Sequence, residues 1–224
     1  MLEKFQRTRA AMSLLSTLQD RTTQFETPFR HWELDQPLTQ AMVDEVAATS
    51  VMDGPRSYDG TRAADAGGGG LDAVLRCYVT PDNVGDFPAL AGLVKELRAP
   101  ETVEHIGGLI KRDLRQAYLR LEVIVDREGF WLQPHKDIKE KLMSMQLYVN
   151  VAGEAQNLGT DIYREVSEGS LELAKTIAYR NNSGYMFSAG TDTWHGLEKK
   201  QVRQERRSLL INYVTFKTGW KLPA

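Results

Sequence analysis

A histidine and an aspartate two residues apart, followed much further along the chain by a second histidine, constrain this sequence most. His135 and Asp137 stand in Trp131-Leu-Gln-Pro-His-Lys-Asp137, and His195 stands in Thr193-Trp-His-Gly196. Residues two apart on a strand face the same side, so an imidazole nitrogen and a carboxylate oxygen can occupy adjacent corners of an octahedron. With His195 from another strand, the set has the donors of a two-histidine, one-carboxylate iron site whose open positions indicate catalysis.

The other histidines offer no comparable arrangement. The chain has 4 histidines, and neither His31 nor His105 has a carboxylate or basic neighbour arranged for chemistry. We expect both to be ordinary surface or core residues. A His-x-Asp pair alone often arises by chance, so the hypothesis depends on the second histidine and on the segments around it.

Several short segments in the second half of the chain follow one another in a distinctive order and spacing. They are Leu121-Glu-Val-Ile-Val-Asp126, His135-Lys-Asp137, Gln146-Leu-Tyr-Val-Asn150, Leu158-Gly-Thr-Asp-Ile-Tyr163, Ser183-Gly-Tyr-Met-Phe187, His195-Gly196 and Arg206-Arg-Ser208. In these segments the chain resembles the 2-oxoglutarate- and Fe(II)-dependent oxygenases of the prolyl-hydroxylase-like branch. The first 120 residues carry no matching motif, and Leu158-Gly159 stands where many relatives have two glycines.

This resemblance implies an activity and its cofactors. His135, Asp137 and His195 would bind Fe(II), and 2-oxoglutarate and O2 would be co-substrates, with succinate and CO2 released. The expected reaction is hydroxylation of an unactivated C–H bond in a small-molecule or peptidyl substrate, and nothing in the sequence distinguishes these classes.

The predicted strand over residues 206–214 offers a cation for the distal carboxylate of 2-oxoglutarate, since a buried anion needs a partner. Alternation places Arg206 and Ser208 on one face and Arg207 on the other. A guanidinium with a hydroxyl two residues later can bind one carboxylate, which favours Arg206 with Ser208 and leaves Arg207 as a solvated charge, although the choice between the two arginines stays open. The resemblance adds the Tyr148 hydroxyl as a further donor, whereas a tyrosine in a strand is more often a packing residue.

The pattern of apolar residues predicts one domain over residues 1–224, mainly β with flanking helices. Residues 1–120 are expected to be mostly helical, with helices over 1–20, from an Asp35 cap to 48, over 81–100 and over 101–118, a strand over 29–34 and a mobile loop over 53–70. From 121 to 216, short strands separated by Gly, Asn and Asp turns dominate. Antiparallel strands in two facing sheets, a double-stranded β-helix (jelly roll, cupin-like), are the expected core.

Charge and cysteine content narrow the possible partners. A net charge of −2 indicates neither nucleic acid nor an anionic membrane as a partner. The single Cys77 and an N-terminus without an apolar signal core favour a cytoplasmic protein, and the oligomeric state stays open.

Two other classes of protein are also compatible with such a barrel. One is a cupin-like metalloenzyme without 2-oxoglutarate, which the Arg206 and Ser208 pair disfavours. The other is a non-catalytic binding module that has lost its metal, which the intact triad disfavours. A halogenase is disfavoured because Asp137 leaves no place for chloride.

Overall fold

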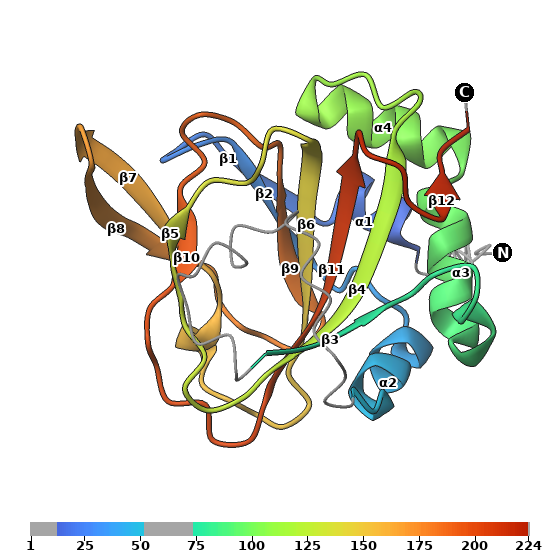
Figure 1. The fold of residues 1–224 in the computed structure, drawn as a ribbon, viewed down its shortest axis with the longest axis horizontal. Coiled ribbons are helices and arrows are strands. Elements are labelled where there is room, and N and C mark those ends of the chain that lie inside the picture. Colours follow the sequence, from blue (N-terminus) through green and yellow to red (C-terminus); the bar gives the residue numbers. More distant parts are fainter. Residues whose placement is uncertain (1–12, 52–73, 224) are drawn as a thin grey trace, which may run out of the picture.

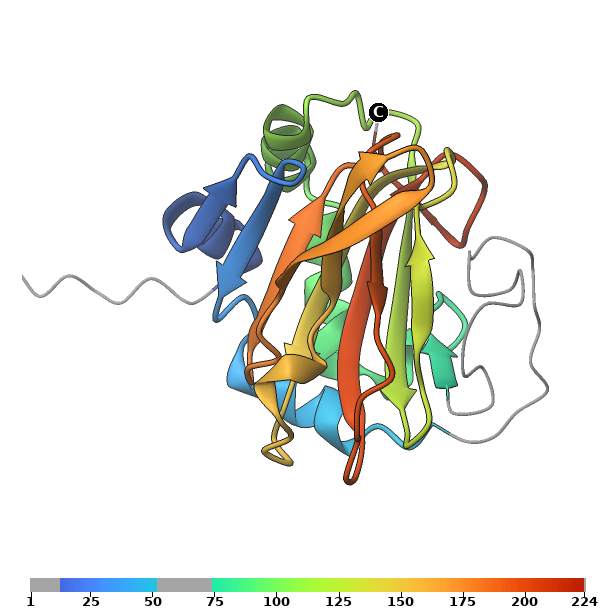
Figure 2. The same cartoon turned by 90° about the vertical axis from the view of Figure 1, so that its left-hand side faces the viewer.

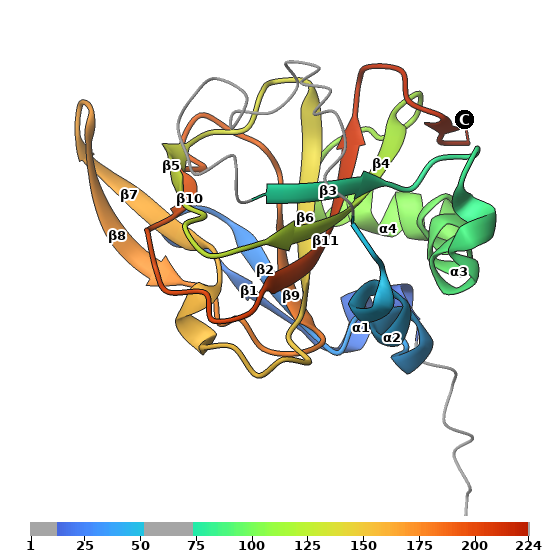
Figure 3. The same ribbon diagram turned by 60° about the horizontal axis from the view of Figure 1, so that its bottom comes forward.

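The computed structural model describes residues 13–51 and 74–223, which form two facing antiparallel sheets with helices on one outer side (Figure 1). The large sheet has the order β1-β2-β9-β6-β11-β4-β12, and β3 also pairs with β4 (Figure 3). The small sheet has the order β5-β10-β7-β8 and lies in front of the large one in Figure 2. The predicted double-stranded β-helix core is therefore confirmed.

The strands range from 2 to 9 residues, and the longest, of 9 residues each, are the central strands β4, β6 and β11 of the large sheet. Those of the large sheet are β1 (Thr22–Phe25), β2 (His31–Asp35), β3 (Val74–Tyr78), β4 (Tyr118–Asp126), β6 (Lys141–Val149), β9 (Ser183–Phe187), β11 (Arg206–Val214) and β12 (Trp220–Lys221). Those of the small sheet are β5 (Leu132–His135), β7 (Asp161–Ser167), β8 (Ser170–Thr176) and β10 (His195–Leu197).

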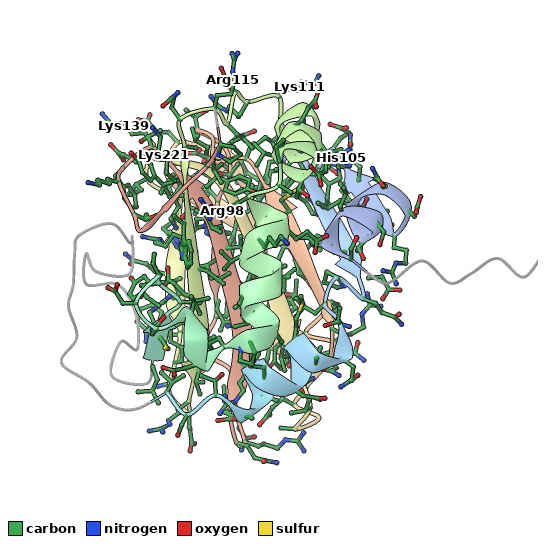
Figure 4. The ribbon with its side chains drawn as sticks, turned by 90° about the vertical axis from the view of Figure 1, so that its right-hand side faces the viewer. Arg98, His105, Lys111, Arg115, Lys139 and Lys221 are labelled. Carbon is green, nitrogen blue, oxygen red and sulfur yellow. The ribbon has the colours of Figure 1, made fainter. Side chains whose placement is uncertain are left out.

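Helices cover the outer face of the large sheet. They are α1 (Leu14–Asp20), α2 (Gln40–Ala48), α3 (Pro88–Leu97) and α4 (Pro100–Ile110). A 3-10 turn at Val84–Asp86 precedes α3, and another at Gln156–Leu158 precedes β7 of the small sheet. Figure 4 views this side, where the labelled Arg98 lies beside α3 and Lys111 lies at the end of α4. The Tyr213 hydroxyl of β11 donates a hydrogen bond to the last carbonyl of α3, that of Leu97, at 2.6 Å. Among the described residues, no helix has the length and apolar character needed to cross a membrane.

Each central strand of the large sheet has two chemically different faces. Toward the helices, β4, β6 and β11 present buried apolar residues: Leu121, Val123, Val125, Met143, Met145, Leu147, Leu209 and Ile211. Toward the small sheet they present buried polar residues: Arg120, Glu122, Asp126, Ser144, Arg206, Ser208 and Asn212. Cross-strand pairing aligns the polar residues, because Arg206 is the Cα partner of Asp126 and Ser208 that of Tyr148. The alternation predicted for the β4 and β11 segments is confirmed.

The described part of the chain before residue 120 contains helices, as the sequence predicts, together with strands that it does not predict. The predicted strand over 29–34 is present as β2, and β1 and β3 are additional strands of the large sheet. Short strands such as β1 carry little periodic signal, and their pairing with β2 and β4 is a tertiary contact. The expected loop over 53–70 and most of the helix expected over 1–20 lie outside the described residues.

Three expected helix boundaries are wrong. The helix expected from residue 81 begins at Pro88, after a 3-10 turn at Val84–Asp86. Thr39 caps α2 by accepting a hydrogen bond from the Met42 N–H at 3.3 Å, whereas Asp35 is the last residue of β2. The helix expected to reach residue 118 ends at Ile110, because Lys111 adopts a left-handed conformation (φ 55°) that stops it. These boundaries depend on local backbone conformation, which the periodicity of apolar residues does not predict.

Arg207 is not the solvated charge that the alternation of β11 suggested. Its Nη1 donates hydrogen bonds to the carbonyls of Val46 (3.0 Å) and Thr49 (2.7 Å), at the C-terminal end of α2, and its side chain is 13% exposed. A guanidinium stabilises a helix C-terminus by satisfying its free carbonyls. Arg207 therefore joins the helical layer to the sheet, on the face opposite Arg206.

Candidate active site

A cavity of about 90 Å³ lies between the two sheets and brings together four of the six predicted site residues, His135, Asp137, His195 and Arg206. It corresponds to roughly six to nine water-sized positions, enough for a small ligand. Its wall combines charged groups with apolar residues. The polar lining residues are Arg76, Asp126, His135, Asp137, Lys141, Ser144, Gln146, Thr160, Tyr185, His195 and Arg206.

The two histidines come from neighbouring strands of the small sheet. His135 ends β5 and His195 begins β10, the two are Cα partners, and their ring centroids lie 4.3 Å apart. Gly196 follows His195 because the strands approach closely there: a Cβ at this position would lie 2.6 Å from the Leu132 carbonyl oxygen. The glycine thus lets β10 lie against β5 with both rings side by side.

Both imidazole rings are held in the same way. Nδ1 of His135 lies 3.0 Å from the Gln133 carbonyl, and Nδ1 of His195 lies 2.9 Å from the Thr193 carbonyl. Since a carbonyl only accepts, each Nδ1 carries the hydrogen and each Nε2 keeps a free lone pair. This second hydrogen bond is what metal-binding histidines commonly have.

Strand alternation is not what places Asp137 beside the histidines. It lies beyond the end of β5, so the expected placement of His135 and Asp137 on one strand is wrong. Instead, Lys141 Nζ donates to Oδ1 and Ser144 Oγ donates to Oδ2, both at 2.5 Å. Anchoring by β6 thus sets the position of this carboxylate.

Burial sets the protonation states of the triad. It lowers the pKa of His135 to about 3, with a further contribution from His195, and it lowers the pKa of His195. Burial raises the pKa of Asp137, but the Lys141 ammonium, His195 and the hydrogen bonds from Lys141 and Ser144 together outweigh burial and hold that pKa below its usual range. At neutral pH the site therefore presents two neutral imidazoles and one carboxylate, the forms that bind a metal.

These residues fit a mononuclear divalent metal ion. One ligand atom from each of His135, Asp137 and His195 lies within 4.8 Å of the others. Two nitrogen donors and one carboxylate oxygen match the set used by non-haem iron sites with open positions.

Arg206 lies on the cavity wall, as the sequence predicts, but it is already engaged. Its Nε donates to the Leu158 carbonyl at 2.5 Å, and its Nη1 donates to Asp126 Oδ2. The rings of Tyr148 and Tyr179 lie 5.5 and 5.7 Å from the guanidinium carbon, within the range of cation–π attraction.

Tyr148 and Ser208 are fully buried and are not among the residues that line the cavity. The Tyr148 hydroxyl donates to Thr160 Oγ1 and accepts from the Thr160 N–H, both at 2.9 Å. Ser208 Oγ accepts a hydrogen bond from Gln146 Nε2 at 3.0 Å. Both residues therefore position Thr160 and Gln146, which do line the cavity.

Three further lining residues were absent from the sequence-based site. Tyr185, on β9, lies with its hydroxyl 3.5 Å from Gln146 Oε1, and Arg76, on β3, donates to Glu122 at 3.0 Å. Asp126 pairs with Arg206 across β4 and β11. Alternation along each strand was the available signal, but only the strand order shows which strands are neighbours.

Comparison with known proteins finds solved structures of similar architecture. No family model and no curated protein matches the chain. Among solved structures, a Pseudomonas putida prolyl-4-hydroxylase matches over 91% of this chain and 100% of its own, with 14% identity and a TM-score of 0.54. HygX from Streptomyces hygroscopicus, solved with nickel and 2-oxoglutarate, matches over 85% of each chain, with 12% identity and a TM-score of 0.52. The epimerase SnoN from nogalamycin biosynthesis matches over 82% of this chain and 76% of its own, with 13% identity and a TM-score of 0.52.

The chain therefore has the fold of the 2-oxoglutarate- and Fe(II)-dependent oxygenases, with a possible His-Asp-His metal site inside it.

Proposed function

We propose that this protein is a 2-oxoglutarate- and Fe(II)-dependent dioxygenase that hydroxylates an unactivated C–H bond. One observation carries the proposal: a single cavity contains the donors of His135, Asp137 and His195 together with the guanidinium of Arg206. A dicarboxylic co-substrate needs both features, a metal for its 2-oxo acid end and a buried cation for its far carboxylate.

Each residue has a task that follows from its contacts. The Nε2 atoms of His135 and His195 and a carboxylate oxygen of Asp137 would hold the metal, while Lys141 and Ser144 orient that carboxylate. Arg206 would bind the far carboxylate of 2-oxoglutarate. Bound metal and 2-oxoglutarate supply the oxidising chemistry, in which O2 is consumed and succinate and CO2 are released.

The substrate is proposed as a small molecule or a peptidyl side chain. Structures with this fold include HygX with hygromycin B bound and a Trichoplax adhaerens prolyl hydroxylase in complex with a peptide fragment. The small volume of the cavity favours a substrate that inserts only its reacting group, because a dicarboxylate would occupy most of the space.

The test is succinate formation from 2-oxoglutarate by the Fe(II)-loaded protein across a panel of metabolites and peptides. We expect turnover that His195→Ala abolishes. A protein that binds Fe(II) at His135 and His195 yet neither binds nor consumes 2-oxoglutarate would contradict the proposal.

One observation favours a second candidate, a cupin-like metalloenzyme that uses no 2-oxoglutarate. Arg206 is neutralised by Asp126 in the structure, so the cavity has no cation reserved for a second carboxylate at that point. Metal-dependent binding of 2-oxoglutarate decides between the two candidates.

A further inference from the structure

Asp126 carries a buried oxygen atom that the fold leaves unsatisfied. The residue is 1% exposed and lines the cavity, and its Oδ2 accepts a hydrogen bond from Arg206. Its Oδ1 has no hydrogen-bond partner among the described residues. Buried carboxylate oxygens are normally hydrogen-bonded, so an unsatisfied one on a cavity wall points to a ligand.

The charged groups around Asp126 come from several elements. Arg206 on β11 binds it directly, and Arg76 on β3 attracts it but donates its own hydrogen bond to Glu122. Glu122 is on the same strand, four residues earlier, and the Tyr179 hydroxyl lies near enough to interact electrostatically. Burial raises the pKa of the Asp126 carboxyl, and Arg206 and Arg76 oppose this rise without cancelling it.

A dicarboxylate that reaches Arg206 meets Asp126 at the same guanidinium. Two ionised carboxylates that close together in a buried site repel each other strongly, and a shared proton removes the repulsion. We propose that Asp126 takes up one proton from solvent when 2-oxoglutarate binds, and that its Oδ1–H then donates a hydrogen bond to the far carboxylate of the co-substrate. Oδ2 keeps the hydrogen bond from Arg206, and no other bond changes. The inference rests on the proposed function and adds a recognition residue to it.

Asparagine reproduces the protonated form of Asp126 without the proton. Its amide oxygen can accept from Arg206 while its amide nitrogen donates to the co-substrate. Asp126→Asn should therefore bind 2-oxoglutarate with no proton uptake, whereas wild type should take up about one proton per 2-oxoglutarate bound. Above the pKa of Asp126 in the free protein, wild-type affinity should fall about tenfold per pH unit, and that of Asp126→Asn should stay constant.

The experiment is calorimetric titration of 2-oxoglutarate into protein preloaded with Mn(II), in buffers of different ionisation enthalpy, from pH 6 to pH 8.5. Preloading completes any proton release from the metal-binding histidines before the titration. The ligand control is 2-oxopentanoate, which has a methyl group in place of the far carboxylate and should bind without proton uptake. The matched variant is Glu122→Gln, a buried carboxylate of the same strand face outside the cavity lining, which should keep the uptake.

Three results would overturn the inference: no proton uptake in wild type, equal uptake in Asp126→Asn, or loss of 2-oxoglutarate binding by Asp126→Asn at every pH. The last would show that Asp126 acts only as an anion that holds Arg206. Absence of 2-oxoglutarate binding to Mn(II)-loaded wild type at every pH would instead overturn the proposed function. The wild-type titration therefore separates the two failures.

Discussion

The two faces of the large sheet are both buried, but the face toward the small sheet carries a row of charged and polar side chains among its apolar ones, whereas the face toward the helices holds the main apolar cluster. On the helical side, Leu209 and Ile211 of β11 are fully buried in the main apolar cluster. On the side of the small sheet, Arg206 and Asn212 of the same strand are buried among hydrogen bonds and ion pairs. Burying charges is costly even when they are paired, whereas burying apolar groups is favourable.

This contrast separates stability from function within single strands. The apolar face can supply most of the free energy of folding, because hydrophobic burial dominates that balance. A charged row that ends at a cavity contributes little net stability, so we attribute it to recognition and chemistry. Variants on the two faces can test this division.

Removal of a metal ligand should have the largest effect. His195→Ala deletes one of three protein donors, and because the loss of groups that merely orient ligands costs about 10 to 100-fold in metal affinity, we expect a larger loss here. Anaerobic Fe(II) titration measures it. His105→Ala, on α4 of the helical side, is the control and should bind metal normally. Normal Fe(II) binding by His195→Ala would show that His195 is not a metal ligand.

The two adjacent arginines test the division within one strand. Arg206→Ala should weaken 2-oxoglutarate binding by one or more orders of magnitude, because truncating one partner of a buried charge-assisted pair costs about 2 to 5 kcal/mol. Arg207→Ala should leave that binding within a few-fold and instead lower stability by about 1 to 3 kcal/mol, since it loses two hydrogen bonds to the end of α2. Binding titrations and urea unfolding of both variants measure this. The reverse pattern would show that the faces are misassigned.

Truncating a buried side chain on the apolar face should lower the free energy of unfolding without affecting the candidate metal site. Leu209→Ala removes a fully buried side chain and should lower the free energy of unfolding by about 2 to 5 kcal/mol. Its neighbour Ser208→Ala, on the polar face, should lower it by only about 1 kcal/mol. Chemical denaturation measures both, and Fe(II) affinity should stay within twofold in Leu209→Ala. A tenfold change in that affinity would mean that the two faces are coupled.

The smallest effect concerns His31, which is buried on β2 and whose Nδ1 donates to the Phe29 carbonyl. Burial lowers its pKa, with a smaller contribution from Lys175 in the same direction. The unfolded chain therefore binds a proton below about pH 6.5 that the folded chain rejects, so stability is full above that pH and falls as the pH drops below it. In His31→Asn the side-chain amide can still donate a hydrogen bond to the Phe29 carbonyl. The free energy of unfolding of this variant, measured by urea unfolding, should fall less steeply between pH 7 and pH 5 than that of wild type. An unchanged slope would contradict this assignment.

Much of the site was predictable from residue types and spacing. His135, Asp137 and His195 come together, and strand alternation separates Arg206 from Arg207. The reason given for Asp137 was wrong, because its position depends on Lys141 and Ser144 rather than on a shared strand. The cavity-lining roles of Arg76, Asp126 and Tyr185 were missed because these residues lie on strands whose neighbours are set by pairing over long sequence distances.

Alternation and residue chemistry are local properties, so the sequence alone specifies which side chains share a strand face and which donors a metal would find. It also specifies the antiparallel, turn-rich character of the core. By contrast, Asp126 lies opposite Arg206, Arg207 holds the end of α2, and Tyr148 and Ser208 support the cavity wall without forming part of it, only because the chain folds as it does. These contacts join residues that are distant in the chain, and strand order and register, which no local pattern encodes, bring them together.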